Sequence, residues 1–178
     1  MHQLLLLRHA KALRDEPRIA DHARPLLPAG WRAAGAIRRA MTELRLLPDV
    51  ALVSSSRRTL QTLEALEPFE ETPLVEPLDS LYDATASEIL DVLHRVPETA
   101  RSVLVVGHNP GLHELARLLA GKAAMAAPAT AELRRLARSY PTATLSEFAI
   151  PGAWGTLGHG GGRLLRFLPA ADLPQMAS

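Results

Sequence analysis

An arginine–histidine pair, Arg8 and His9, follows directly on the apolar run Leu4 to Leu7. The run is typical of a buried strand, so the pair is expected at the carboxyl end of that strand. A guanidinium is permanently charged and offers a planar fork of donors that suits a phosphate group, and a neutral imidazole is a nucleophile or proton carrier near pH 7. Such a pair also occurs where a strand simply meets solvent. The chemistry therefore depends on whether other strand ends supply matching groups.

Two other predicted strands end in groups of the same kind. The run Val50 to Val53 leads through three serines to Arg57 and Arg58, and the run Val103 to Val106 leads to His108. Parallel strands place their carboxyl ends along one edge of a sheet, where ligands bind in open α/β folds. We therefore expect the arginines and histidines of the three strand ends to share one pocket.

The residues at these strand ends resemble the motifs of the histidine phosphatase superfamily. The chain has Leu-Arg-His-Ala at 7–10, Ser-x-x-x-Arg-x-x-Gln-Thr at 54–62 and Gly-His-Asn-Pro at 107–110. Arg24-Pro25-Leu26 ahead of Gly30, and Tyr140-Pro141-Thr142 before a late strand, are similar to the small SixA-like phosphohistidine phosphatases. The resemblance implies a three-layer α/β/α fold of the phosphoglycerate-mutase-like type, with a mainly parallel central sheet.

By the same resemblance His9 is the nucleophile that accepts the phosphoryl group, and Arg8, Arg58 and His108 hold the phosphate oxygens. The motif places the arginine three residues before Gln61, which selects Arg58 and leaves Arg57 as a surface charge. Phosphoryl transfer depends mostly on positioning and on stabilising the equatorial oxygens, which two guanidiniums and an imidazole supply without a metal. No cofactor and no metal are expected.

Several polar residues near the motifs have two readings each. Ser54 either caps the following helix or donates to the phosphate, and Asn109 either caps a helix or touches the phosphate. A general acid, if one is present, is Asp21, Asp79 or Asp83, although turn and surface roles fit these aspartates as well.

None of these aspartates is a clear general acid. This favours a phosphohistidine substrate, because a leaving imidazole is less basic than an alkoxide and needs less acid assistance. The short chain lacks room for a large lid, which favours a phosphorylated protein over a small metabolite. A phosphomonoesterase acting on a small phosphate ester is the first alternative. A non-catalytic phosphate-binding module is the second, although binding alone would not require the nucleophile His9.

Apolar runs and helical spacing predict alternating strands and helices around these motifs. We expect strands at 4–7, 50–53, 73–76, 103–106, 143–150 and 163–168, and helices at 31–44, 57–66, 110–119 and 132–138, with another after a capping box of Thr85 and Glu88. Residues 121–143 are expected to pass over one edge of the sheet. The predicted organisation is a single domain, 1–178, with a poorly ordered tail over 170–178.

Composition limits the possible partners. The net charge is only +1, which gives no electrostatic case for binding nucleic acid or an anionic membrane surface. There is no cysteine, which excludes disulfides and thiolate metal sites and fits a reducing compartment. The N-terminal leucine run is too short for an export signal, and no segment has the length of a membrane span. A cytoplasmic, monomeric protein is expected.

Overall fold

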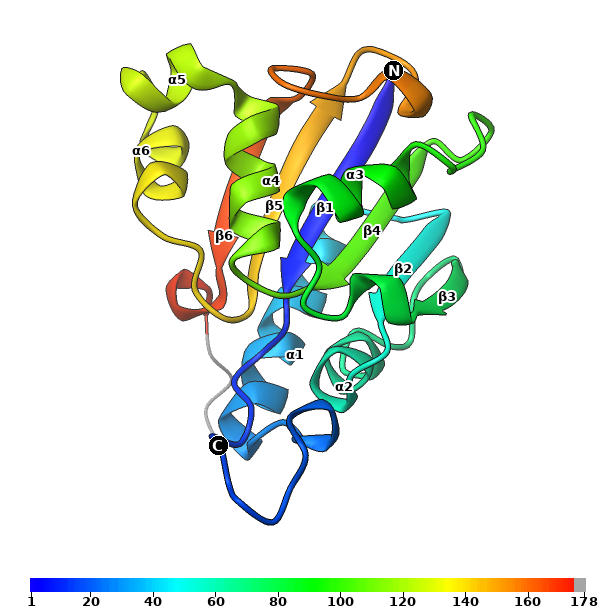
Figure 1. The fold of residues 1–178 in the computed structure, drawn as a ribbon, viewed down its shortest axis with the longest axis vertical. Coiled ribbons are helices and arrows are strands. Elements are labelled where there is room, and N and C mark those ends of the chain that lie inside the picture. Colours follow the sequence, from blue (N-terminus) through cyan, green and yellow to red (C-terminus); the bar gives the residue numbers. More distant parts are fainter. Residues whose placement is uncertain (175–178) are drawn as a thin grey trace.

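A computed structural model describes residues 1–174 and contains one six-stranded sheet with helices on both of its faces (Figure 1). The strand order is β3-β2-β4-β1-β5-β6. The strands are β1 (His2–Arg8), β2 (Val50–Ser54), β3 (Leu74–Leu78), β4 (Ser102–Gly107), β5 (Thr144–Ile150) and β6 (Arg163–Pro169). The first four are mutually parallel, and β5 and β6 are antiparallel additions beside β1. The predicted three-layer, mainly parallel architecture is confirmed.

The helices form the two outer layers. They are α1 (Pro28–Glu43), α2 (Arg57–Glu64), α3 (Ala86–Leu93), α4 (Gly111–Ala120), α5 (Lys122–Ala126) and α6 (Ala131–Arg138). Helices α3, α4 and α6 cover one face and α1 and α2 cover the other (Figure 1). Strand β1 contributes to both cores, since Leu4 and Leu6 pack in the first and Leu5 and Leu7 in the second. This two-sided burial explains why β1 has consecutive leucines rather than alternating polar residues.

The segment between β1 and α1 is folded back on itself. Leu13 N–H donates to Pro25 O at 2.8 Å, and Leu27 N–H donates to Lys11 O at 3.0 Å. The short 3₁₀ helix η1 (Asp21–Ala23) lies within this loop. The helix was predicted to begin at residue 31, but α1 begins at Pro28, because proline fits the first turn of a helix, where its missing N–H is not needed.

Three local predictions need correction or confirmation. The capping box of Thr85 and Glu88 at α3 is confirmed. Asn109 does not cap α4: the Asn109–Pro110 peptide bond is cis, Pro110 is the N-cap, and the Asn109 side chain bonds elsewhere. The predicted tail starts too early, because 170–172 form the 3₁₀ helix η4 (Ala170–Asp172) and Ala170 is buried. Residues 175–178 lie outside the described residues.

Residues 121–143 follow the edge of the sheet as expected. Helices α5 and α6 lie beside α4 and β6, the edge strand, with Leu136 buried in the core (Figure 1). Within residues 1–174, no helix is both long enough and apolar enough to cross a membrane.

Candidate active site

His9 lies just beyond β1 with its ring held in one orientation. Its backbone N–H donates to Gly107 O at 3.1 Å, which ties it to the end of β4. Its Nδ1 lies 2.8 Å from Ala10 O, and because a carbonyl oxygen only accepts, Nδ1 carries the proton. The lone pair is therefore on Nε2. Burial, together with the charges of Arg58, Arg8 and Arg24, lowers the pKa of His9 to about 4, so the ring is neutral at pH 7.

Arg58 reaches the same place from the first turn of α2. Ser56 caps this helix by accepting a hydrogen bond from Thr59 N–H, and the helix geometry then leaves Arg57 exposed and Arg58 buried, with 3% of its surface accessible. Arg58 Nη1 donates to Asp21 O at 2.8 Å, and Nη2 donates to Asp21 Oδ2 at 3.1 Å. The loop after β1 thus fixes the direction of the Arg58 guanidinium.

His108 is buried between Arg58 and Ser54. Its Nε2 lies 2.7 Å from Ser54 Oγ, and its Nδ1 lies 3.4 Å from Arg58 Nη2. The ring centroids of His9 and His108 are 5.3 Å apart. Burial, followed by the neighbouring His9 and Arg58, lowers the pKa of His108 to about 3. Ser54, the last residue of β2, therefore bonds to the buried imidazole of His108. The prediction that Ser54 caps the following helix is wrong, because Ser56 is the N-cap.

Arg8 ends β1 and is held by the segment that precedes β5. Its Nη1 donates to Tyr140 O at 2.9 Å, and the same carbonyl accepts from Asn109 Nδ2 at 2.9 Å. Burial lowers the pKa of Arg8. Its charge contributes to the lowered pKa of both His9 and His108. Arg8, His9, Arg58 and His108, the four residues that the sequence selected, therefore lie together as one cluster at the carboxyl ends of the parallel strands.

The three candidate acids have different surroundings. The carboxylate of Asp21 accepts from Tyr82 Oη, Arg24 and Arg58, and these contacts, the Tyr82 bond above all, hold the pKa of Asp21 far below its usual range. Asp83 is exposed, with Oδ1 4.0 Å from both Arg58 Nη2 and His108 Nδ1. Asp79 begins the 3₁₀ helix η2 (Asp79–Leu81), and within residues 1–174 its side chain has no hydrogen bond or ion pair to the cluster.

Sequence reasoning missed two side chains that lie around the cluster. Tyr82 contacts both Asp21 and His108, and Arg24 binds Asp21 and Leu13 O. Both lie on irregular segments, where no apolar periodicity indicates which way a side chain points. Arg24 belongs to a motif that carried the family resemblance, but Tyr82 had no such signal.

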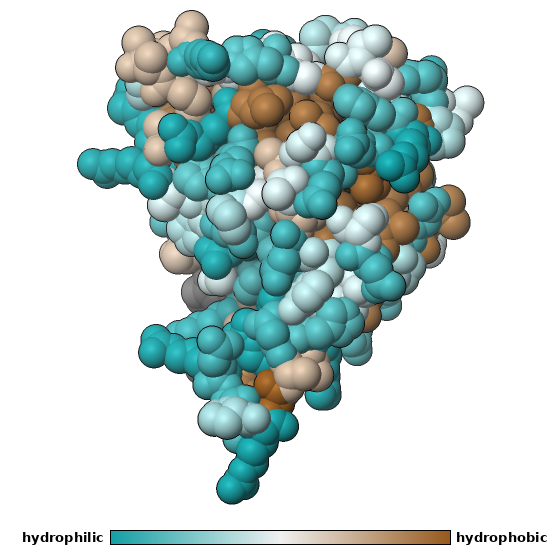
Figure 2. Space-filling view, viewed as in Figure 1, coloured by the Kyte–Doolittle hydropathy of each residue, from teal (hydrophilic) through white to brown (hydrophobic). Residues whose placement is uncertain are grey.

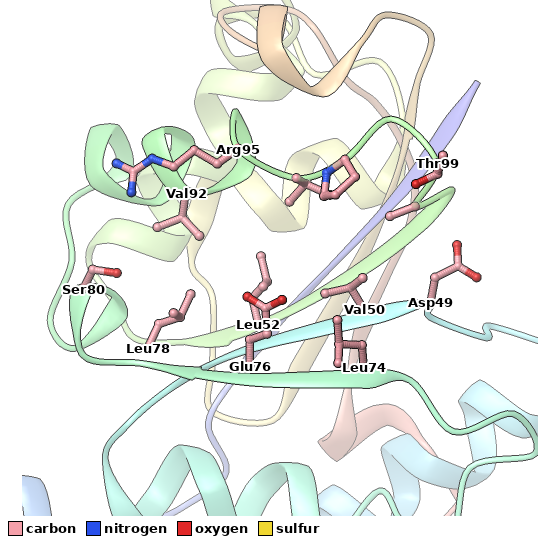
Figure 3. Close-up of a pocket in the computed structure, with 13 residues that line it drawn as sticks. Asp49, Val50, Leu52, Leu74, Glu76, Leu78, Ser80, Val92, Arg95 and Thr99 are labelled. Carbon is pink, nitrogen blue, oxygen red and sulfur yellow. The ribbon is translucent and has the colours of Figure 1, made fainter.

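The cluster is separate from the groove that lies between α3 and the strands β2 and β3. Within residues 1–174, no three His, Asp or Glu side chains converge in a way that would hold a metal ion. A groove of about 590 Å³ lies elsewhere, between α3 and the strands β2 and β3 (Figure 3). Its floor is apolar, with Leu52 and Leu78, while Glu76 and Arg95 stand on its walls, and Figure 2 shows hydrophobic side chains gathered beside α3 over these strands. None of the four cluster residues lines it.

Comparisons with known proteins identify the family of this chain. No family model matches the chain. An uncharacterised protein of Mycobacterium tuberculosis is 32% identical over 164 residues, which cover 90% of this chain and 98% of that protein. A structure from Nakamurella multipartitia, assigned as phosphohistidine phosphatase SixA, has a TM-score of 0.81 and 32% identity over 94% of this chain and 95% of its own. The chain belongs to the histidine phosphatase superfamily, among its SixA-like members.

Other histidine phosphatases have the same fold. A structure assigned as SixA from Agrobacterium tumefaciens has a TM-score of 0.78 and 27% identity over 94% of this chain and 97% of its own. A SixA solved with tungstate is only 20% identical, but its TM-score is 0.74 over 96% of this chain and 98% of its own. The phosphoglycerate-mutase-like fold expected of a histidine phosphatase is thus confirmed.

Proposed function

We propose that this histidine phosphatase hydrolyses phosphohistidine in a protein, through a phosphoryl group carried on His9. The observation that carries the proposal is the state of the His9 ring. Its Nδ1 proton is bound to Ala10 O, which leaves the lone pair on Nε2, in a ring whose centroid lies 5.3 Å from that of His108. The charges of Arg58 and Arg8 help to lower the pKa of this ring. A neutral imidazole at pH 7, next to groups that bind an anion, is arranged for nucleophilic attack on phosphorus.

The proposed reaction has two steps. In the first, His9 Nε2 attacks phosphorus, the bond to the leaving group breaks, and the leaving group keeps the electron pair and takes a proton from solvent. In the second, water attacks the phosphorus of phospho-His9, which releases inorganic phosphate and returns the electron pair to Nε2. Arg8, Arg58 and His108 would stabilise the equatorial oxygens in both steps, a task that requires no metal.

The state of the aspartates supports phosphohistidine as the substrate. Asp21 is held ionised by Tyr82, Arg24 and Arg58, so it is a poor proton donor at neutral pH. A leaving imidazole has a lower pKa than an alkoxide and requires less protonation in the transition state. The turn between β3 and α3 is short, spanning 79–85, and no long insertion covers the cluster. An open site of this kind suits a side chain presented by a protein.

The test is phosphate release from a phosphohistidine-containing protein in the presence of a chelator. The wild-type chain is expected to release phosphate and to trap radiolabelled phosphate on His9 after an acid-free quench. His9→Ala is expected to lose both the turnover and the label, while still binding inorganic phosphate. Undiminished turnover by His9→Ala contradicts the mechanism, and turnover that chelation abolishes contradicts metal independence.

One observation favours a second candidate, a phosphomonoesterase that acts on a small ester. Asp83 Oδ1 lies 4.0 Å from His108 Nδ1 and the side chain is 59% exposed, so it is placed to protonate an alkoxide. Under this alternative, alkyl phosphates are preferred and Asp83→Asn lowers their turnover far more than that of phosphohistidine. Phosphate binding without turnover of any substrate would instead indicate a binding module. The single-domain organisation, cytoplasmic location and monomeric state stay predictions.

A further inference from the structure

A row of rings leads from the surface of the molecule to His9. The centroid distances are 4.9 Å from His22 to Tyr82, 5.6 Å from Tyr82 to His108, and 5.3 Å from His108 to His9. Exposure falls along the row, because His22 is exposed, Tyr82 is partly exposed and His108 is only 3% accessible. The outer two rings therefore stand at the mouth of the site.

Tyr82 is held firmly at this mouth. Its hydroxyl donates to Asp21 Oδ2, and that carboxylate is itself fixed by Arg24 and Arg58. The Arg58 guanidinium carbon lies 5.9 Å from the centre of the Tyr82 ring, within reach of a cation–π interaction. His22 meets the ring at an interplanar angle of 71° and is anchored by Nε2 to Ser55 Oγ at 3.0 Å. The loop that carries Asp21 and the turn that carries Ser55 therefore hold the rings of Tyr82 and His22 in place, and these two rings form a wall at the mouth of the site.

The direction of attack decides what meets this wall. In an in-line displacement the leaving group departs on the side of phosphorus opposite His9 Nε2. A leaving group that belongs to a protein substrate must stay connected to solvent, so with Arg58 and His108 on the equatorial oxygens it must depart toward the more exposed rings of Tyr82 and His22. We propose that Tyr82, backed by His22, determines specificity by packing against a planar heteroaromatic leaving group such as the substrate imidazole. This inference rests on the proposed function and names the part of the site that recognises the leaving group.

The chemistry of the wall fits a flat ring better than an alkyl chain. An aromatic pair in an edge-to-face or offset arrangement is stabilised beyond the area that it buries, and a small alkyl or ammonia leaving group cannot form one. Burial of the Tyr82 ring is incomplete, so surface remains for such a contact. Tyr82 contacts the phosphate-binding groups without itself belonging to them, so it is expected to change discrimination between substrates more than phosphate binding.

The test compares two substrates that share a P–N bond, a phosphohistidine peptide and phosphoramidate, whose leaving group is ammonia. Tyr82→Leu removes the ring, whereas Tyr82→Phe keeps the ring and removes only the bond to Asp21. We expect Tyr82→Leu to lower kcat/KM for the phosphohistidine peptide roughly 2- to 12-fold more than for phosphoramidate. Tyr82→Phe is expected to keep the ratio of the two constants close to that of the wild type.

Inhibition by inorganic phosphate is the control for the phosphate pocket, and its inhibition constant is expected to stay within about twofold in both variants because no equatorial donor is removed. An equal loss for both substrates in Tyr82→Leu, or the same change of ratio in Tyr82→Phe, overturns the role of the ring. The absence of His9-dependent turnover in the wild type is a different result. It refutes the proposed function, and with it any leaving-group site.

Discussion

At the scale of single residues, neighbours in the sequence have very different surroundings. Arg57 and Arg58 share a charge and a helix, yet Arg57 is exposed while Arg58 is 3% accessible and binds Asp21 through both terminal nitrogens. One helical residue corresponds to a rotation of about 100°, which suffices to turn a side chain from the site to solvent. The pair therefore provides a matched test of the phosphate-binding role.

We expect Arg58→Ala to lower kcat/KM by roughly 100- to 1000-fold, the usual cost of losing one preorganised donor, and Arg57→Ala to change it less than twofold. Arg58→Lys is expected to restore little, because one ammonium cannot replace a fork that uses two nitrogens. Steady-state kinetics with a common substrate measure the effect, and thermal unfolding checks that each variant is folded. Comparable losses in Arg57→Ala and Arg58→Ala contradict the assignment.

The sequence predicted the residues at strand ends and missed those that loops bring in. Arg8, His9 and His108 follow apolar runs whose ends are easy to locate, and their convergence follows from the parallel sheet. Tyr82 reaches the site through a turn in which Asp83 has a φ of 47°, a backbone path that no pattern of apolar residues encodes. Ser54 illustrates the same limit, since three consecutive serines do not reveal which one caps the helix.

At the scale of elements, helix α1 supports the loop that carries Asp21 and Arg24. Gly30 lies in its first turn, and a Cβ at this position would come within 2.2 Å of Lys11 O, a backbone atom that cannot move aside cheaply. Gly35 lies in the same helix, where a Cβ would meet only a flexible Arg39 nitrogen at 3.9 Å. The two glycines share a helix but differ in what they pack against.

Gly30→Ala is therefore expected to destabilise the protein by about 1–3 kcal/mol, through displacement of the loop or the helix. Gly35→Ala is expected to stabilise it by about 0.5–1 kcal/mol, because alanine lowers the conformational entropy of the unfolded chain and has the higher helix propensity. Urea unfolding of both variants measures these differences. No destabilisation by Gly30→Ala would show that the close approach to Lys11 does not require glycine, and destabilisation by Gly35→Ala would show that the open space beside Gly35 does not decide its effect.

Elements with strong apolar patterns were predictable, and those that depend on a polar side-chain contact or that bury little were not. The strands β1, β2 and β4 are buried on both faces and were identified from their runs of consecutive apolar residues. Helix α5, with no buried residue, left no periodic signal in its Ala-rich sequence. The start of α4 was misjudged because Pro110, not Asn109, is its N-cap, and the Asn109 side chain donates to Tyr140 O instead.

At the scale of the whole molecule, the two buried neutral histidines of the site make the folded protein less stable at acidic pH. The pKa values of His9 and His108 fall to about 4 and about 3 in the folded protein, against 6.5 for an unperturbed imidazole. Between pH 6.5 and pH 4 the unfolded chain therefore binds protons that the folded chain does not. The free energy of unfolding must fall as the pH falls through this window, and above pH 7 neither histidine contributes to a slope.

From pH 7 to pH 4.5 we expect each of these histidines to lower the free energy of unfolding by about 2 kcal/mol, and no comparable change between pH 7 and pH 8. The lowered pKa of Asp21 affects stability only below this range, since a carboxylate with a depressed pKa loses its contribution at more acidic pH.

Urea unfolding of the wild type and of His108→Gln at pH 7 and pH 4.5 measures the effect. His108→Gln should reduce the difference between the two pH values by about 2 kcal/mol, because glutamine does not titrate. A difference as large in His108→Gln as in the wild type would mean that His108 is protonated in the folded protein, and a charged His108 would then have to be included among the groups that bind phosphate.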